Sequence, residues 1–409
     1  MKKIFVSILS ALLLAGAYDA SACSAIVISG KYTADGKPLI LKTRDQGLKN
    51  FNTNIKFHQR GKYDFISMGP TPWVAAEKIK STGGGMNSQG LCMAALTSNS
   101  FPTDTLKVKG HSSAAIQLYA LANCRSIEEF EAYLASIPQP LAVRFNLCVT
   151  DAFGGAAIYE FGRNTWVKYD VNDPKDAPEG WRCCTNFAFS GDDPSKTGVD
   201  RYEDCVEIMK AVRKNKDGKY ELTPEFLMDQ CGRSFINVRE GINDGNITAA
   251  AIIDKGLVSY WRSSNLIVFQ GVPQNTDPKF SVMWTALGHP RCSPLIPLIP
   301  SLGNTIPSYI DNPPAREAGI FSLVMKISDI YLYHSEDKGN KNRELDVNNA
   351  KALRKCAAAA ESQINALFIP LHAKWEKGKI SDEKFKEEYL KQLDKYFEIF
   401  KKEFAAYLQ

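Results

Sequence analysis

A cysteine directly follows a typical export cleavage site in this chain, at Ala20-Ser21-Ala22-Cys23. Two lysines and an apolar run at residues 4–17 precede it, which is the composition of a secretory signal. Small residues stand at the positions that signal peptidase reads. We therefore predict a signal peptide at residues 1–22, a mature chain that begins with Cys23, and a periplasmic or extracellular location.

An N-terminal cysteine can act as a nucleophile without a histidine partner, because its own α-amine can take the proton from its thiol. In short peptides these two groups titrate near ~8 and ~8.5, so they are matched for proton transfer near neutral pH. The alternative is a lipid anchor, in which an acylated Cys23 tethers a non-catalytic binding module as a surface lipoprotein. A lipobox usually has Leu where this chain has Ala20, which favours the nucleophile.

Two β-prone runs follow the cysteine, at residues 25–29 and 38–42, and Asp35-Gly36 between them is a strong hairpin signal. Antiparallel pairing of these strands brings Cys23 and Asp45 to the same end of the hairpin. A carboxylate there can hold the α-ammonium or orient the amine. An ordinary hairpin with a charged end would have the same pattern, so the hairpin alone does not decide between the two.

A second chemical cluster lies at Thr185-Asn186 and at Arg201-Tyr202, where a helix is predicted to begin. An amide side chain at a strand end can donate to the oxyanion that forms when a thiolate attacks an amide carbonyl. Asn186 is placed for that role. In isolation, Asn186 would be a turn residue and Arg201 a solvated helix residue; their order after Cys23 and Asp45 favours a function.

These motifs, in this order, resemble the N-terminal-nucleophile (Ntn) amide hydrolases, and most closely the group of penicillin V acylase, choloylglycine hydrolase and isopenicillin-N acyltransferase. That group usually carries Arg-x-x-Asp or Gln-Asn-x-Asp after the second strand. This chain has Lys42-Thr43-Arg44-Asp45. Asp45 therefore matches, whereas Lys42 occupies the aligned basic place and Arg44 has the expected side chain, so either could fill that place.

The resemblance extends to the oxyanion hole. The Gly-rich turn at residues 83–90 is similar to the family's Gly-Met-Asn-x-x-Gly-Leu turn, and the strand after it would lend a backbone N–H at Thr97 or its neighbour. Thr185-Asn186 is similar to the family's Leu-Thr-Asn strand. Arg201-Tyr202 is similar to its Ser-x-Arg-Phe element, whose arginine lies beside the nucleophile.

Composition excludes several classes of function. The chain of 409 residues is 44% hydrophobic, which provides a sizeable core, and its net charge is only +5 with the basic residues spread out, which argues against a nucleic-acid surface. After the signal, no apolar run approaches the ~20 residues of a membrane span.

The five histidines lack metal-ligand spacing, so we expect no metal, and no cofactor is predicted. Ten cysteines leave nine besides Cys23, and their spacing specifies no disulfide; Cys183 and Cys184 are predicted to be buried small residues.

The resemblance implies an α+β fold, a four-layer αββα Ntn sandwich over residues 23–310. Residues 311–409 are predicted to form a helical C-terminal extension, which could serve stability, lid formation or association into a homo-oligomer. Helices are predicted at residues 111–123, 126–137, 200–212 and from 223. Strands are predicted at residues 91–97, 143–151, 156–161, 165–169, 264–272 and 280–287, with an extended stretch at 289–307.

The resulting hypothesis is a secreted cysteine amidohydrolase or acyltransferase that acts on the linear, non-peptide amide bond of a small N-acyl substrate. Its catalytic residues would be Cys23, Asp45, Asn186 and Arg201, with Lys42, Arg44 and Thr97 as further catalytic or binding residues. A secreted Ntn-type dipeptidase is a second enzyme hypothesis, because such enzymes start with a similar Cys-x-x-x-x-Val-x-Gly-Lys pattern.

Overall fold

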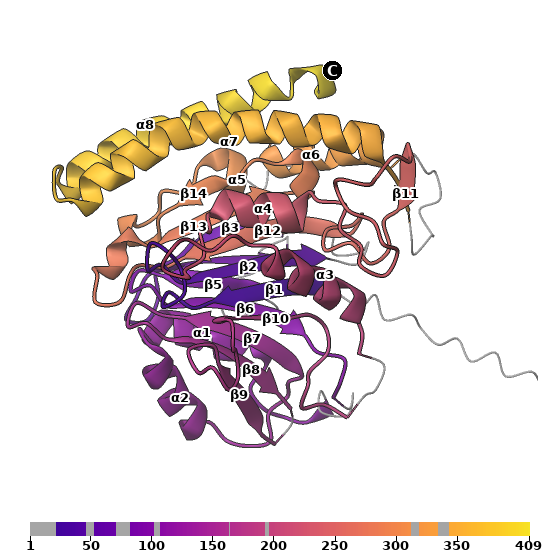
Figure 1. The fold of residues 1–409 in the computed structure, drawn as a ribbon. Coiled ribbons are helices and arrows are strands. Elements are labelled where there is room, and N and C mark those ends of the chain that lie inside the picture. Colours follow the sequence, from indigo (N-terminus) through magenta and orange to yellow (C-terminus); the bar gives the residue numbers. More distant parts are fainter. Residues whose placement is uncertain are drawn as a thin grey trace, which may run out of the picture.

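A computed structural model describes residues 22–45, 53–70, 82–101, 107–162, 164–192, 196–311, 319–333 and 343–409. The predicted signal peptide lies outside these residues, except for Ala22. The described residues form an α+β structure with two antiparallel sheets and flanking helices (Figure 1). None of the helices described has the length and apolarity needed to cross a bilayer.

The first sheet contains the predicted hairpin at its centre. Its six strands run in the order β10-β1-β2-β12-β13-β14, and every neighbouring pair is antiparallel. The hairpin prediction is confirmed, since β1 and β2 pair along their whole length. The strands are β1 (Cys23–Ile28), β2 (Leu39–Asp45), β10 (Trp181–Cys184), β12 (Ser263–Gln270), β13 (Val282–Leu287) and β14 (Ile296–Leu298).

The second sheet is a seven-stranded antiparallel meander in sequence order, β3 to β9. The sequence predicts one turn over residues 83–90, but Gly84–Asn87 forms strand β5. A Cβ on Gly84 would lie 2.1 Å from the Met93 carbonyl oxygen, so the missing side chain lets β5 approach its neighbour. The strands are β3 (Thr53–His58), β4 (Phe65–Pro70), β5 (Gly84–Asn87), β6 (Cys92–Thr97), β7 (Phe145–Thr150), β8 (Ala156–Phe161) and β9 (Trp166–Asp170).

The two sheets pack face to face, with β1 and β2 against β6 and β7 (Figure 1). Helices α1 (Ser113–Asn123) and α2 (Ile127–Ser136) cover the outer face of the seven-stranded sheet, where Leu121 and Phe130 belong to a separate apolar cluster. Helices α3 (Val199–Lys210) and α4 (Pro224–Gly232) pack on β1, β2, β10 and β12 of the other sheet. The hairpin that carries Cys23 is therefore covered on both faces.

The predicted helix starts are confirmed where a side chain caps the helix. The Ser126 hydroxyl accepts from the Glu129 N–H at the start of α2, and Thr223 caps α4 in the same way, with Pro224 in its first turn. Residues 289–307 differ in part from the extended stretch predicted, because Pro290 and Pro300 each begin a short 3₁₀ turn. The 3₁₀ turns are η4 (Pro278–Phe280), η5 (Pro290–Cys292), η6 (Pro300–Leu302) and η9 (Ala405–Tyr407).

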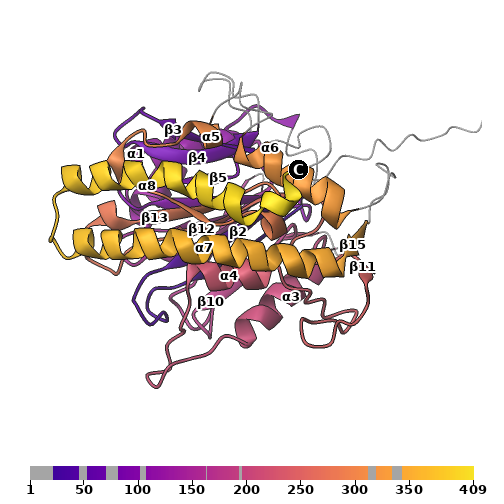
Figure 2. The same cartoon turned by 90° about the horizontal axis from the view of Figure 1, so that it is seen from above.

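The C-terminal region is helical, as predicted, and its two long helices α7 (Val347–Glu376) and α8 (Asp382–Glu403) run side by side above the sheets (Figure 2). It is tied to the rest of the chain by strand pairing and by a buried ion pair. Strand β11 (Ala251–Ile253) pairs with β15 (Glu344–Asp346), and Glu361 of α7 binds Arg233. The shorter helices are α5 (Ser308–Asp311), α6 (Ile320–Ile327) and a π-helical turn, η8 (Ser328–Leu332).

Candidate active site

The β1–β2 hairpin brings Cys23 and Asp45 together, as the sequence predicts. Cys23 stands opposite Arg44 in the antiparallel register, and the Asp45 N–H donates to the carbonyl oxygen of Ala22 at 2.8 Å. Residues 29–38 connect the two strands, and Gly36 in this loop has a φ of 74° that favours glycine. Both residues are buried, so the site lies at a covered end of the hairpin rather than at an exposed charged one.

The Cys23 side chain faces the second sheet. Residues that are directly opposite on neighbouring antiparallel strands share a face, and Cys23, Arg44 and Asn265 stand in one such row. The Asn265 side chain reaches Met68 of β4 in the other sheet, at 3.4 Å, which shows which way this face points. The sulfur therefore lies on the inner face of its sheet, toward the second sheet.

Lys42 and Arg44 both lie on this inner face, two residues apart on β2. The Lys42 ammonium is 3.4 Å from the Cys23 sulfur and is 1% exposed. Burial lowers the pKa of the Arg44 guanidinium to about 10, and the charge of Cys23 opposes this shift. The Lys42 ammonium hydrogen-bonds the sulfur, and Arg44 stands directly opposite Cys23 in the strand register.

The opposite face of the hairpin is held by Arg201, in the first turn of α3. Its Nη1 donates to the Cys23 carbonyl oxygen at 2.6 Å and to Ser24 Oγ at 3.1 Å, and its Nη2 donates to Asn186 Oδ1 at 2.9 Å. The guanidinium is 5% exposed and lies 3.9 Å from Asp45 Oδ2. Arg201 thus contacts three of the other predicted site residues, instead of lying on a solvated helix face.

Asn186 joins the start of β1 to the end of β6. Its Oδ1 accepts from the Cys23 backbone nitrogen at 2.8 Å, and its Nδ2 donates to the Thr97 carbonyl oxygen at 2.8 Å. The next two N–H groups after Thr97 are engaged elsewhere, because Ser98 donates to the Arg144 carbonyl and Asn99 to that of Asn186. Asn186 therefore sits beside the nitrogen of Cys23 and beside the strand end that carries Thr97.

Asp45 is fully buried and has a partner that sequence reasoning missed. Ser263, the first residue of β12, donates its hydroxyl to Asp45 Oδ1 at 2.5 Å. Burial raises the pKa of Asp45 to about 6, although the charge of Arg201 and the Ser263 hydrogen bond oppose the rise. The sequence predicts a strand near Ser263, but no local motif marks the serine, since its role depends on the pairing of β12 with β2.

The structure thus gathers all seven candidates in one place: Cys23, Lys42, Arg44, Asp45, Thr97, Asn186 and Arg201. Two further contacts of the hairpin were also missed, because Ser24 accepts from Arg201 and its N–H donates to Thr43 Oγ1 at 3.0 Å. Among the described residues, no group of three or more His, Cys, Asp or Glu side chains is arranged to hold a metal ion.

A protein-family model matches part of the chain, including most of this cluster. Residues 33–221 match the model of acyl-coenzyme A:6-aminopenicillanic acid acyl-transferase, a span that includes Asp45, Asn186 and Arg201. Over this span the chain is similar to the acyl-transferase and penicillin V acylase group of Ntn hydrolases. This similarity suggests an Ntn amidase or acyltransferase, and it implies an amide as the substrate.

Several solved structures are similar to this chain at low sequence identity. Penicillin V acylase from Agrobacterium tumefaciens is 17% identical over 68% of this chain and 86% of its own, with a TM-score of 0.41. A conjugated bile acid hydrolase from Clostridium perfringens is 14% identical over 68% and 92%, with a TM-score of 0.40. Penicillin G acylase from Alcaligenes faecalis is 10% identical over 51% of each chain, with a TM-score of 0.33. No curated protein matches the sequence significantly.

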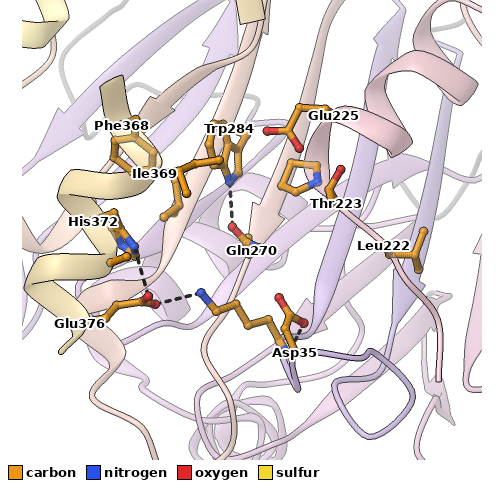
Figure 3. A pocket seen from close by; sticks show the side chains of 14 residues that line it. Asp35, Leu222, Thr223, Glu225, Gln270, Trp284, Phe368, Ile369, His372 and Glu376 are labelled. Carbon is orange, nitrogen blue, oxygen red and sulfur yellow. Dashed lines mark hydrogen bonds and ion pairs between the residues drawn. The ribbon is translucent and has the colours of Figure 1, made fainter. Parts of the chain in front are cut away.

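A cavity of about 180 Å³ lies at the other end of the hairpin, and it is separate from this cluster. Its lining includes the turn residues Asp35 and Lys37, Trp284 of β13, and His372 and Glu376 of α7 (Figure 3). Lys37 and Glu376 form an ion pair of 2.8 Å across one side. Because Lys37 lies seven positions before Arg44, which pairs with Cys23, this cavity is roughly 20 Å from Cys23 along β2.

Proposed function

We propose that this chain uses Cys23, once it is the N-terminal residue, to cleave linear, non-peptide amide bonds or to transfer their acyl group. The observation that carries the proposal is the position of the two reactive atoms of one residue. The Cys23 nitrogen is 2.8 Å from Asn186 Oδ1, and its sulfur is 3.4 Å from the Lys42 ammonium. Base and nucleophile are therefore each held by a separate buried partner.

In the proposed acylation, the α-amine of Cys23 takes the thiol proton as the sulfur attacks the amide carbonyl carbon. The buried cation of Lys42 stabilises the thiolate electrostatically. The oxyanion accepts hydrogen bonds from Asn186 Nδ2 and from the backbone N–H at Thr97. The intermediate collapses when the α-ammonium gives its proton to the leaving nitrogen. The C–N bond breaks, and a thioester forms on Cys23.

Deacylation follows the same steps as acylation, with a different nucleophile. Water, or an acceptor amine in the case of acyl transfer, loses a proton to the α-amine and attacks the thioester carbonyl. The thiolate leaves and is reprotonated. Arg201 keeps the reacting residue in place through both steps, because it binds the Cys23 carbonyl oxygen and Asn186 Oδ1 together. Asp45 helps to hold Arg201 in this position, since its carboxylate lies 3.9 Å from the same guanidinium.

The proposal requires that the peptide bond between Ala22 and Cys23 be cut, since an amide nitrogen has no lone pair available to take a proton. Export and cleavage after Ala22 would expose the amine and would place the enzyme in the periplasm or outside the cell. In the uncut chain the Ala22 carbonyl occupies the Asp45 N–H. Cleavage therefore also releases a backbone donor next to the nucleophile.

The test is a mass measurement of the mature N-terminus together with a substrate screen. We expect a free Cys23 and turnover of one class among N-acyl amino acids, bile-acid conjugates and penicillin V. Hydroxylamine, added as an acceptor amine, would yield a hydroxamate if acyl transfer competes with hydrolysis. Cleavage of dipeptides alone would assign the chain to the dipeptidases instead. A diacylglyceryl group on Cys23, or full activity of a Cys23→Ser variant, would refute the mechanism.

A further inference from the structure

Two cysteines outside the proposed mechanism meet between the sheets. Cys148 of β7 and Cys184 of β10 lie with their sulfurs 3.4 Å apart, although 36 positions separate them in the sequence. Their side chains are 0% and 3% exposed. In the structure they are thiols, but a disulfide has its sulfurs ~2.05 Å apart, so a shift of about 1.4 Å would suffice to join them.

We propose that Cys148 and Cys184 form a disulfide that joins the seven-stranded sheet to the six-stranded sheet. The inference rests on the proposed export, because disulfides persist in oxidising compartments. Of the two adjacent cysteines, Cys183 and Cys184, the geometry selects Cys184 as the partner of Cys148. Neighbouring residues of a strand point to opposite faces, and Cys183 faces the helix side, where its thiol interacts with Cys205 of α3.

The bond would act next to the candidate active site. Cys184 stands opposite Ala25 of β1 and precedes Asn186 by two residues, so a cross-link here fixes the strand that delivers Asn186 to Cys23. It would also remove two thiols from the inner face on which the Cys23 sulfur lies. An oxidising compartment would otherwise offer Cys23 two neighbouring partners for a wrong disulfide, and that bond would consume the nucleophile.

Formation of this bond needs an oxidant, and a small-molecule disulfide such as oxidised glutathione can supply it. One cysteine thiolate attacks a sulfur of the oxidant, forms a mixed disulfide and expels a thiolate. The second cysteine thiolate then attacks the protein sulfur and expels the other thiolate. Two protons leave the cysteines, and two electrons reduce the oxidant to two thiols. Because both sulfurs are buried in the folded chain, the reaction takes place while the chain folds.

Peptide mapping tests this bond directly. The chain is refolded with oxidised and reduced glutathione and is then alkylated in denaturant without a reductant. Cleavage with trypsin leaves Cys148 on the peptide of residues 145–163 and Cys184 on the peptide of residues 183–196. A Cys183→Ser background leaves a single cysteine on the second peptide. We expect a linked pair that is two hydrogens lighter than the two free peptides and that separates on reduction. Cys92, equally buried on β6, serves as the control and should be alkylated.

A thermal measurement supplies the second readout. Reduction should lower the Tm of the wild-type chain on the order of 5 °C, and it should not change the Tm of the Cys148→Ser/Cys184→Ser double variant. Alkylation of both cysteines in a correctly refolded chain would overturn the inference, as would a link from Cys148 to any other cysteine. The mass of the Cys23 N-terminus and the amidase assay are read separately, so failure of the proposed function and failure of this bond remain distinguishable.

Discussion

The Lys42 ammonium lies 3.4 Å from the Cys23 sulfur, and both side chains are buried. A cation so close to a thiol favours the thiolate, which is the form that attacks. Replacement of Lys42 by Met should therefore lower the rate at which iodoacetamide alkylates Cys23 at pH 7 by roughly tenfold or more.

The matched variants decide between the two basic residues. Lys42→Arg should restore much of the rate, because it restores a cation on the sulfur side. Arg44→Gln should have the smaller effect, since the Lys42 ammonium lies within hydrogen-bonding distance of the sulfur, at 3.4 Å. If Arg44→Gln slows alkylation more than Lys42→Met does, Arg44 and not Lys42 fills the family's basic position.

The Asn186 side chain has two expected roles: its Nδ2 donates to the oxyanion, and its Oδ1 accepts from the Cys23 nitrogen and from Arg201. Asn186→Asp keeps an acceptor for the Cys23 nitrogen and for Arg201 but loses the N–H donor. It should lower the acylation rate by about a hundredfold or more, since one oxyanion donor contributes ~3 kcal/mol to the transition state. Single-turnover kinetics measure that step.

Asn186→Ala should lose the same rate and also lose stability, by about 1–3 kcal/mol, because it removes the acceptor that the buried Cys23 nitrogen and Arg201 guanidinium use and that Asp keeps. Urea unfolding separates the two variants. An Asp variant that acylates at the wild-type rate would remove Asn186 from the oxyanion hole.

The order of motifs along the chain predicted most of the candidate site. The hairpin signal at Asp35-Gly36 predicts that β1 and β2 pair, so the meeting of Cys23 with Asp45 at one end follows from local sequence. Asn186 and Arg201 were predicted from the family resemblance, and their contacts with Cys23 depend on β10 pairing with β1 and α3 packing beside it. Those contacts are non-local, and no spacing in the sequence encodes them.

Ser263 shows what the sequence could not reveal. It stands 218 positions from Asp45, and its hydroxyl reaches the carboxylate only because β12 inserts between β2 and β13. The strand itself was predicted, but its neighbours in the sheet were not. The pairing of β11 with β15 was missed for a different reason, since strands of three residues are too short to show a period of two.

The buried carboxyl of Asp45 should make stability depend on pH. Its pKa is raised to about 6 in the folded chain, whereas the ordinary pKa of an aspartate is 3.8, so the folded state binds the proton more tightly. Between these values the unfolded state carries fewer protons, and the free energy of unfolding therefore falls as pH rises. Relative to an Asp45→Asn variant, the wild type should lose about 2 kcal/mol between pH ~4 and pH ~6.

Urea unfolding of both proteins at several pH values measures this difference, and all other titrating groups cancel. The chain that begins at Ala22 is the appropriate form, because it keeps the Asp45 N–H bound to the Ala22 carbonyl. A stability difference that does not change across this range would show that Asp45 titrates normally despite its burial.

The C-terminal helices are expected to contribute to stability through one ion pair. Glu361 of α7 accepts two hydrogen bonds from Arg233, at 2.7 and 2.9 Å, and a third from the Leu295 N–H. Glu361→Gln leaves the Arg233 guanidinium buried without its counter-charge, which should cost about 3–5 kcal/mol. The exposed helix pair of Glu387 and Lys391 provides a control, and Glu387→Gln should change the unfolding midpoint little.

The final prediction isolates the α-amine of Cys23. A chain that begins at Ala22 and one that begins at Cys23 differ by a single alanine, and in both the Cys23 nitrogen can donate to Asn186 Oδ1. They should therefore fold alike, but only the second has an amine that can accept a proton. We expect the Ala22 form to hydrolyse amides at least about a hundredfold more slowly, which is the usual contribution of a general base.

The comparison requires mass spectra before and after the assay, to show that Ala22 is retained. Removal of Ala22 by an aminopeptidase should restore the rate to that of the Cys23 form. Equal rates for the two forms, with Ala22 intact, would mean that the amine is not the base. Another group, such as the Asp45 carboxyl, would then have to take the proton, and the assignment of Cys23 as an Ntn nucleophile would fail.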